Sequence, residues 1–336
     1  MRTRTLLALA AATTMAFVSL TTPAQARPAT PLTHTVDPRP SNDVLAAQLK
    51  DLARTSHGRI KVRSIGDTNE GRPVWAARLG HGPVRIQYVT QQHGNEPLGT
   101  PAAVEFLRTV GVPNTAWHRW LLSRITLDVV VRANPDGHQR NWRYNYDPDA
   151  DPEYGEKGKG YDINRYHNPS MAPADNPATE AAHIQRAYAA FRPHIAMDYH
   201  MQGRYVDGEG REITASLMWP THPDVAPSAV DAAKQVTVVA QQTIDRLAGG
   251  NVSQYPGGDY EGIARNAYGL LGSASVLLEL SAIDDEQSQI RAAYLVMLTV
   301  AQTAADGSLR RVDPARADAI PLRGAPVGAE AVEAAD

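Results

Sequence analysis

The chain has 336 residues, of which 43% are hydrophobic, and it carries 33 basic and 36 acidic side chains and no cysteine. This length and hydrophobic content predict one large domain with a real core, and the sequence shows neither an internal repeat nor a heptad run. The weakly negative charge and the lack of a long basic run argue against nucleic acid or a membrane surface as partner. Because disulfides are excluded, core burial or a bound metal ion must hold the fold together.

The first 26 residues have the pattern of an export signal peptide. Arg2 and Arg4 precede an apolar stretch, and Ala24-Gln25-Ala26 forms a small-residue cleavage site. We therefore expect the mature chain to begin near Arg27 and the protein to be secreted. A transmembrane anchor is the alternative, but the apolar stretch is shorter than the ~20 residues that a span requires. Residues 27–40 contain four prolines and are expected to form an extended leader.

Strands and helices are expected to alternate along the rest of the chain. The first half predicts a helix over 41–56, strands within 59–80 around a turn at 69–71, a strand over 84–89, a helix over 100–110 and a strand from Ile125. After an irregular polar segment at 134–170, the second half predicts helices over 176–192, 227–250 and 285–306 and strands over 194–200 and 274–281. This alternation is typical of an α/β domain with a mostly parallel or mixed sheet, over 41–310. The Ala- and Pro-rich tail from Arg311 to residue 336 lacks a large apolar cluster and is expected to be mobile.

Two of these apolar runs end in potential metal ligands. His93 and Glu96, in the stretch HGNE, follow the run at 84–89, and His200 ends the run at 194–200. Ligands of such sheets collect at the carboxyl ends of strands. Catalytic zinc commonly takes two histidines and one carboxylate. Taken separately, each of these residues could instead belong to an ordinary surface turn, but the two strand ends together favour a zinc site.

Glu279 lies inside an otherwise apolar run at 275–282. Burying a carboxylate there costs several kcal/mol unless it is paired or functional. The alternative is a glutamate at a strand edge that faces solvent. The apolar neighbours on both sides favour a functional carboxylate, which could take a proton from a zinc-bound water.

Six short motifs follow one another along the chain: HGNE, NPDG, NWRYN, DINRYH, MDYH and LLELS. This ordered set resembles the zinc carboxypeptidases of the carboxypeptidase A/B type, over roughly residues 42–305, and in particular a secreted, bacterial-like metallocarboxypeptidase. The resemblance implies a mixed, twisted eight-stranded sheet with helices on both faces. It also implies one zinc ion per chain, a monomer, and hydrolysis of the C-terminal peptide bond of peptides or proteins.

The resemblance also assigns a role to individual residues. It implies that the zinc ligands are His93, Glu96 and His200, and that Glu279 is the general base and acid that acts on the zinc-bound water. It implies that Asp162 hydrogen-bonds the first zinc histidine, that Asn164 and Arg165 hold the substrate's terminal carboxylate, and that Arg143 stabilises the oxyanion. A carboxylate-binding arginine fits removal of a C-terminal residue rather than internal cleavage.

Some of these assignments leave an alternative open. Arg143 and Arg165 could be solvated loop arginines, and Arg140 is the alternative to Arg143. For the mobile tyrosine that closes over substrate in this family, we prefer Tyr255 to Tyr260 because it precedes a Gly-Gly pair.

The residue after that Gly-Gly pair is Asp259. It is a candidate acidic floor of the specificity pocket, which would select C-terminal Lys or Arg. It could also match a neighbouring acid that both specificity classes share, or be a turn aspartate.

Three other functions remain open from the sequence. A zinc amidohydrolase of the aspartoacylase or succinylglutamate desuccinylase kind is disfavoured by the motifs NPDG, WRYN and DINR and by the export signal. A cell-wall peptide hydrolase acting on γ-glutamyl or D-amino-acid bonds would use the same zinc site. An inactive peptide-binding module is disfavoured because Glu279 accompanies all three ligands. Residues 27–40 are too few to fold as an inhibitory pro-domain, so we expect an enzyme made in active form.

Overall fold

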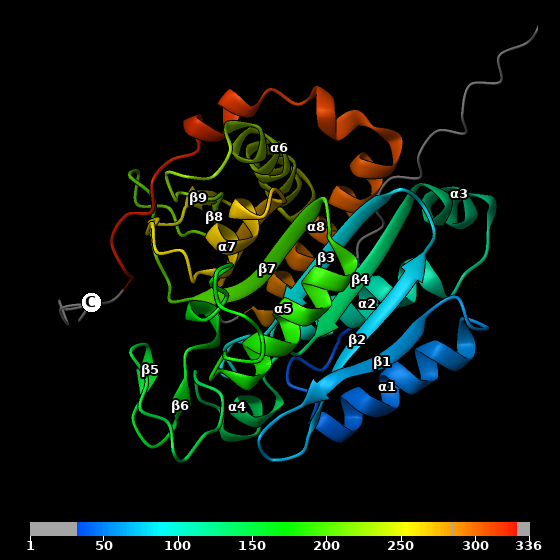
Figure 1. Ribbon diagram of the computed structural model, residues 1–336. Helices are drawn as coiled ribbons and strands as arrows, with labels where there is room; N and C mark the ends of the chain where they lie inside the picture. The colour runs from blue at the N-terminus through cyan, green and yellow to red at the C-terminus, as the bar shows by residue number, and fades with distance from the viewer. Residues whose placement is uncertain (1–31, 284, 328–336) are drawn as a thin grey trace, which may run out of the picture.

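The structure is a computed structural model that describes residues 32–283 and 285–327, so the expected signal peptide at 1–26 lies outside the described residues. Its main element is an eight-stranded mixed, twisted sheet (Figure 1). The strands of this sheet are β1 (Lys61–Asp67), β2 (Pro73–Gly80), β3 (Val84–Thr90), β4 (Ile125–Val131), β7 (Ile195–Gln202), β8 (Ala215–Met218), β9 (Val252–Gln254) and β10 (Ala274–Ser281). A separate antiparallel pair consists of β5 (Gly155–Glu156) and β6 (Gly160–Tyr161).

The strand order is β1-β2-β4-β3-β7-β10-β8-β9. The four central strands β4, β3, β7 and β10 run parallel to one another. Antiparallel pairing joins β1 to β2, β2 to β4, and β8 to β10. Three neighbouring parallel strands, β3, β7 and β10, therefore bring their carboxyl ends to the same edge of the sheet.

Helices cover both faces of the sheet. The α-helices are α1 (Asn42–Thr55), α2 (Gly99–Gly111), α3 (Ala116–Arg124), α4 (Pro135–Arg140), α5 (Thr179–Phe191), α6 (Pro227–Thr243), α7 (Ala264–Leu270) and α8 (Glu286–Asp306). The shorter helical turns are η1 (Ile163–Arg165), η2 (Ile244–Ala248), η3 (Ser308–Arg311) and η4 (Pro314–Ala319). The larger core lies between one face and α1, α2, α3, α6 and α8, whereas α5 and α7 pack on the other face. Figure 1 shows α5 in front of the sheet and α2 and α8 behind it. The predicted fold class is confirmed.

The predicted elements form for the reasons that the sequence suggests. Ser41 Oγ accepts a hydrogen bond from the N–H of Val44 (3.2 Å) and so caps α1. The apolar residues Leu45, Leu49 and Leu52 recur at helical spacing and are buried on one side of that helix. Strands β7 and β10 are buried on both faces, as continuous apolar runs in a parallel sheet generally are.

The remaining long helices and central strands were predicted to within a few residues, but α3, α4, α7, β8 and β9 were not predicted. Among the described residues, no helix is both long and apolar enough to cross a membrane.

The described part of the leader, residues 32–40, contains no helix or strand, but it is attached to the domain. The N–H of Val36 donates to Gln287 Oε1 (2.9 Å), and the carbonyl of Pro40 accepts from Arg132 Nη2 (2.6 Å). Arg132 is almost fully buried, so this contact fixes the start of α1 against the sheet.

The C-terminal segment differs from the prediction of a mobile tail from Arg311. Residues 311–327 pack on the domain, with Ala317 and Ile320 buried. The segment also follows the edge strand β9: the N–H of Gln254 donates to the carbonyl of Pro321 (2.7 Å), and the N–H of Arg323 donates to the carbonyl of Gln254 (3.1 Å). Single apolar side chains and backbone hydrogen bonds anchor this segment, and neither produces a large apolar cluster in the sequence.

Candidate active site

Three predicted site residues lie at the shared carboxyl edge of β3, β7 and β10. His200 and Glu279 lie side by side as register partners in the parallel pairing of β7 with β10. His93 lies three residues beyond the end of β3, whose last residue Thr90 is paired with Tyr199 of β7. The topology thus brings together residues that are up to 186 positions apart in the sequence, from His93 to Glu279.

His93, Glu96 and His200 converge on one point. Their exposed fractions are 3%, 7% and 1%, and one ligand atom from each lies within 4.8 Å of the others. His93 Nδ1 lies 2.8 Å from Glu96 Oε1 and 3.0 Å from His200 Nδ1. His200 Nδ1 lies 2.8 Å from the other carboxylate oxygen, Glu96 Oε2, which also accepts from the N–H of Met201 (3.0 Å). This last bond fixes the carboxylate against the end of β7.

The outer nitrogens of both imidazole rings face carboxylates. His93 Nε2 lies 3.0 Å from Asp162 Oδ1, and His200 Nε2 lies 2.8 Å from Asp198 Oδ2. A carboxylate partner holds the proton on Nε2, so each Nδ1 presents a lone pair to the centre. Two imidazole lone pairs and a carboxylate that point at one another require a positive charge between them. A divalent cation meets this requirement, and the ligand set is the one that catalytic zinc prefers.

The electrostatics of the three side chains agree with a cation at this point. Burial raises the pKa of Glu96, but the two histidines more than offset this effect and hold its pKa well below the usual range. Burial lowers the pKa of His200, but the carboxylates of Asp198 and Glu96 raise it well above its ordinary value. The centre therefore attracts a positive charge, which a metal ion can supply in place of protons.

Close backbone packing shapes the turn that carries His93 and Glu96. A Cβ atom on Gly94 would lie 2.0 Å from the carbonyl carbon of Gly137, at the start of α4, so only glycine fits at position 94. Gln91, just before the turn, has a positive φ of 57°, and its Nε2 donates to the carbonyl of Gly94 (2.8 Å). The motifs HGNE and NPDG are thus packed against each other through Gly94 and Gly137.

Glu279 lies beside this centre and has no ion-pair partner among the described residues. Its exposed fraction is 7%, and its Oε2 makes no hydrogen bond within the described part of the chain. The pKa of Glu279 is raised to about 7, chiefly by burial and also by Glu96, although the two histidines and Arg143 act in the opposite direction. A carboxylate with this pKa can both accept and return a proton near neutral pH.

Arg143 and Asp162 form a salt bridge next to the three potential metal ligands. Arg143 donates to Asp162 Oδ2 from Nε (3.0 Å) and from Nη2 (2.8 Å), and its Nη1 lies 3.6 Å from Glu96 Oε1. Asp162 therefore joins His93 to Arg143. The alternative residue, Arg140, lies elsewhere: it pairs with Glu70 and stacks over Tyr146, with its guanidinium carbon 3.9 Å from the ring centre.

Asn164 and Arg165 belong to η1, directly after Asp162. Asn164 Oδ1 accepts from the N–H of Ala264 (2.9 Å), and its Nδ2 lies 3.2 Å from His200 Nε2. Arg165 Nη1 donates to the carbonyl of Asn164 (3.1 Å). The start of α7 thus holds the side chain of Asn164, and the backbone of η1 holds the side chain of Arg165.

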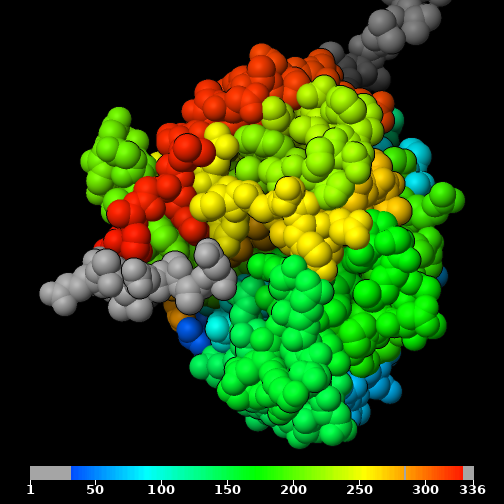
Figure 2. All heavy atoms as spheres, turned by 60° about the vertical axis from the view of Figure 1, so that its left-hand side comes forward, coloured from blue at the N-terminus to red at the C-terminus, as the bar shows by residue number. Residues whose placement is uncertain are grey.

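The site opens into one cavity of about 430 Å³. The predicted site residues in its wall are His93, Glu96, Arg143, Asn164, Arg165, Tyr255 and Glu279. Figure 2 shows the surface hollowed between the segment around residue 260 (yellow) and the loops around residue 150 (green), with the C-terminal segment (red) along one side.

The structure separates the two tyrosines and leaves Asp259 outside the cavity. Tyr255 lines the cavity, whereas the ring of Tyr260 packs on Tyr154, with the ring centres 4.7 Å apart. Asp259 is exposed and is absent from the cavity wall. An acidic pocket floor at this position is therefore a wrong prediction: the turn after the Gly-Gly pair directs Asp259 to solvent.

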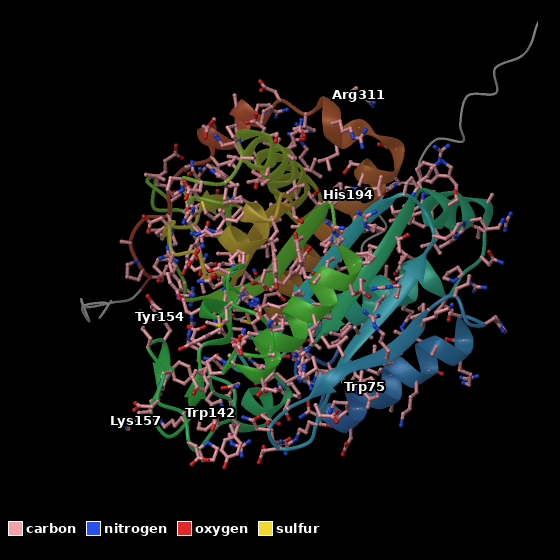
Figure 3. The ribbon with its side chains drawn as sticks, in the orientation of Figure 1. Trp75, Trp142, Tyr154, Lys157, His194 and Arg311 are labelled. Atoms are coloured by element: carbon pink, nitrogen blue, oxygen red, sulfur yellow. The ribbon has the colours of Figure 1, made fainter. Side chains whose placement is uncertain are left out.

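The loop system of residues 134–170 gathers at the same end of the sheet. Figure 3 shows Trp142, Tyr154 and Lys157 on that side of the molecule, whereas His194, just before β7, lies at the opposite end of that strand. The long irregular segment predicted from the sequence thus supplies one wall of the cavity, as functional loops commonly do.

Sequence reasoning missed three residues of this site. Asp198, which bonds His200, precedes it by two positions in β7, and the alternation of a strand would have placed both side chains on one face. Arg265 of α7 and Arg323 of the C-terminal segment line the cavity. No sequence pattern points to these two arginines, since α7 is a helix of only 7 residues and Arg323 lies in no helix or strand.

Comparisons with known proteins bear on the family and the fold of the chain. The family model described as zinc carboxypeptidase matches residues 45–227. A metallo-carboxypeptidase from Burkholderia cenocepacia superposes with a TM-score of 0.59 at 18% identity, over 80% of this chain and 69% of the other. Carboxypeptidase A from Helicoverpa armigera gives a TM-score of 0.61 at 20% identity, over 80% of this chain and 74% of the other. A comparison with curated protein sequences finds no match.

Proposed function

The chain belongs to the zinc carboxypeptidase family, and from this premise we propose that it is a secreted, zinc-dependent enzyme that releases the C-terminal residue of peptides. One observation carries the proposal: His93 and Glu96 of the metal-binding triad share the wall of one cavity with Glu279 and Arg165. Neither Glu279 nor Arg165 has an ion-pair partner among the described residues. Export rests on the sequence of residues 1–26 alone.

The ligands His93, Glu96 and His200 would hold one zinc ion. When bound, zinc lowers the pKa of water and polarises a carbonyl group as a Lewis acid. Asp162 and Asp198 orient the two imidazoles and keep their Nδ1 lone pairs free for the metal.

The other residues act on the substrate. Glu279 takes a proton as water adds to the scissile carbonyl carbon, and it passes a proton to the leaving amine when the C–N bond breaks. Arg143 faces the negative charge that develops on the carbonyl oxygen, a contribution of about 3 kcal/mol where comparable donors are lost. Arg165, with Asn164, binds the terminal carboxylate, and Tyr255 closes over the bound peptide.

We expect hydrolysis of a peptide with a free C-terminus and at least ~100-fold slower hydrolysis of the same peptide with an amidated C-terminus, because only the first offers an anion to the arginine fork. A chelator should abolish the activity and added zinc should restore it. Release of amino acids is measured by mass spectrometry with and without chelator. Internal cleavage, or activity that survives metal removal, would contradict the proposal, and binding without turnover would indicate an inactive module.

Replacing Arg165 by Ala should raise KM for free-carboxylate peptides by ~10- to 100-fold, since a charge-assisted pair is lost, and should change the slow reaction of amidated peptides much less. Arg186 of α5 provides the matched Arg→Ala control. It is exposed and forms hydrogen bonds with the carbonyl of Pro173 and the ring of His183. Equal losses on free and amidated peptides would show that Arg165 has a structural role only.

A further inference from the structure

Three arginines in the cavity wall have no ion-pair partner among the described residues. Arg165, Arg265 and Arg323 all line the cavity, and the hydrogen bonds of their side chains go to neutral acceptors. These acceptors are the Asn164 carbonyl for Arg165, Thr221 Oγ1 and the Gly258 carbonyl for Arg265, and Gln202 Oε1 for Arg323. The proposed function uses only Arg165, for the terminal carboxylate. A peptide with a neutral terminal side chain has no second anionic group at this end that Arg265 or Arg323 could bind.

Arg265 is the buried member of the three. It has an exposed fraction of 3%, and its Nη2 donates to the carbonyl of Gly258 (2.7 Å) and to Thr221 Oγ1 (3.1 Å). Its Nε is buried and has no hydrogen-bond partner within the described part of the chain. Burial lowers the pKa of Arg265 to about 10, so the guanidinium keeps its charge at neutral pH. A buried charge without a counter-ion costs several kcal/mol, which suggests that a bound ligand supplies the anion.

The position of Arg265 differs from that of the rim arginine. Arg323 is half-buried, and its guanidinium stacks over the rings of Tyr205 and Tyr255, with its central carbon 3.8 Å and 4.7 Å from the ring centres. Arg265 lies beside Ile263 and Gly258, which also line the cavity, next to the loop in which the sequence offered Asp259 as a candidate acidic floor. The charge that this loop and α7 present to the cavity is therefore positive.

We propose that Arg265 makes the enzyme select peptides whose C-terminal residue carries a side-chain carboxylate, glutamate or aspartate. The inference rests on the proposed function, since it treats the cavity as the site of the residue that is released. Such a residue has two anionic groups: Arg165 binds its α-carboxylate, and the guanidinium of Arg265 binds its side-chain carboxylate. A terminal lysine or arginine would place a cation against Arg265, and glutamine would lose the charge while keeping the shape.

The test compares N-acylated dipeptides that differ only in the terminal residue: Glu, Asp, Gln, Leu and Lys. In the wild-type zinc enzyme, kcat/KM for Glu should exceed that for Gln by at least ~10-fold, because a buried polar group left unpaired is penalised, and Lys should be slowest. Arg265→Met should bring the Glu-to-Gln ratio close to one and leave Leu within about 3-fold, and Arg265→Lys should keep part of the preference. Arg246→Met, at an exposed position on η2, is the matched control.

Several outcomes would overturn the inference. A wild-type enzyme that hydrolyses the Gln, Leu or Lys substrate as fast as the Glu substrate, or an Arg265→Met enzyme with an unaltered ratio, removes Arg265 from substrate selection. If Arg265→Met lowered kcat/KM for the Leu substrate as much as for the Glu substrate, Arg265 would bind the α-carboxylate instead of the side chain. The ratio of kcat/KM for Glu to that for Gln is measured on the wild-type enzyme, so the inference stays testable if Arg265→Met does not fold.

Binding separates this inference from the proposed function. N-acetyl-Glu and N-acetyl-Gln are titrated into the zinc-loaded Glu279→Gln protein by calorimetry, and tighter binding of N-acetyl-Glu by at least ~10-fold is expected. No turnover of any dipeptide would contradict the proposed function, whereas equal binding of the two ligands would contradict the role of Arg265.

Discussion

Glu279→Gln should lower kcat by at least ~100-fold, the scale of general acid-base catalysis, while zinc and peptide stay bound. Gln has the shape of Glu but cannot take up a proton, and Oε2 of Glu279 makes no hydrogen bond within the described part of the chain that the substitution would break. Removing a buried carboxylate without an ion-pair partner should also leave the free energy of unfolding unchanged or slightly increased. Steady-state kinetics, zinc analysis and thermal unfolding of the variant measure these three quantities.

Glu209→Gln is the matched control, since Glu209 is exposed and its ion pair within residues 32–327 is with Arg211. Its kcat should equal that of the wild type. A Glu279→Gln enzyme with unchanged turnover would mean that another group accepts the proton, and loss of zinc from this variant would mean that Glu279 supports the metal rather than the substrate.

His93→Ala and His200→Ala should each reduce zinc affinity by more than ~100-fold, beyond the 10- to 100-fold that loss of a ligand's hydrogen-bond partner commonly costs. Each substitution leaves one imidazole and one carboxylate, and it also leaves the buried Asp162 or Asp198 without its imidazole partner. We expect near-stoichiometric zinc in the wild type and almost none in the variants after dialysis. Elemental analysis of the purified proteins measures this directly.

His81→Ala is the control for these two variants because His81 is exposed and lies outside the cavity wall. Zinc should raise the melting temperature of the wild type and of this control, since a ligand that binds only the folded state stabilises it. The melting temperatures of His93→Ala and His200→Ala should not respond to zinc. Zinc retained in full by both ligand variants would place the metal elsewhere.

The sequence predicted the central part of the sheet and the metal-binding residues because both depend on strong local patterns. The runs that form β3, β7 and β10 are apolar, and each is followed or interrupted by a polar residue that such a strand would not otherwise contain. The polar residue is His93, His200 or Glu279. Short elements gave no such signal: β9 has 3 residues and β8 has 4, too few to show a period.

The lining of the cavity was harder to predict because it depends on how distant segments pack. Asp259 follows a Gly-Gly pair in a loop that carries no periodic pattern, so its direction could not be read from the sequence, and the structure turns it to solvent. Arg265 lies six residues later, and only the packing of α7 on β7 and β10 places it in the cavity wall. The sign of the charge in a pocket and its depth depend on tertiary packing, which explains why the sequence pointed to Asp259 as a candidate while the structure places Arg265 in the cavity wall.

The segment that follows η4 also bears on self-association. Edge strands expose unpaired N–H and C=O groups, on which a second molecule can add a strand. The N–H and C=O of Gln254 in β9 are already paired with Pro321 and Arg323. The opposite edge strand β1 has a register irregularity between Ser64 and Asp67 that interrupts regular pairing. Both edges of the sheet are thus poor templates for intermolecular strand addition. A chain shortened before Ile320 would expose the edge of β9, so reduced activity in such a form would reflect aggregation as well as the loss of Arg323.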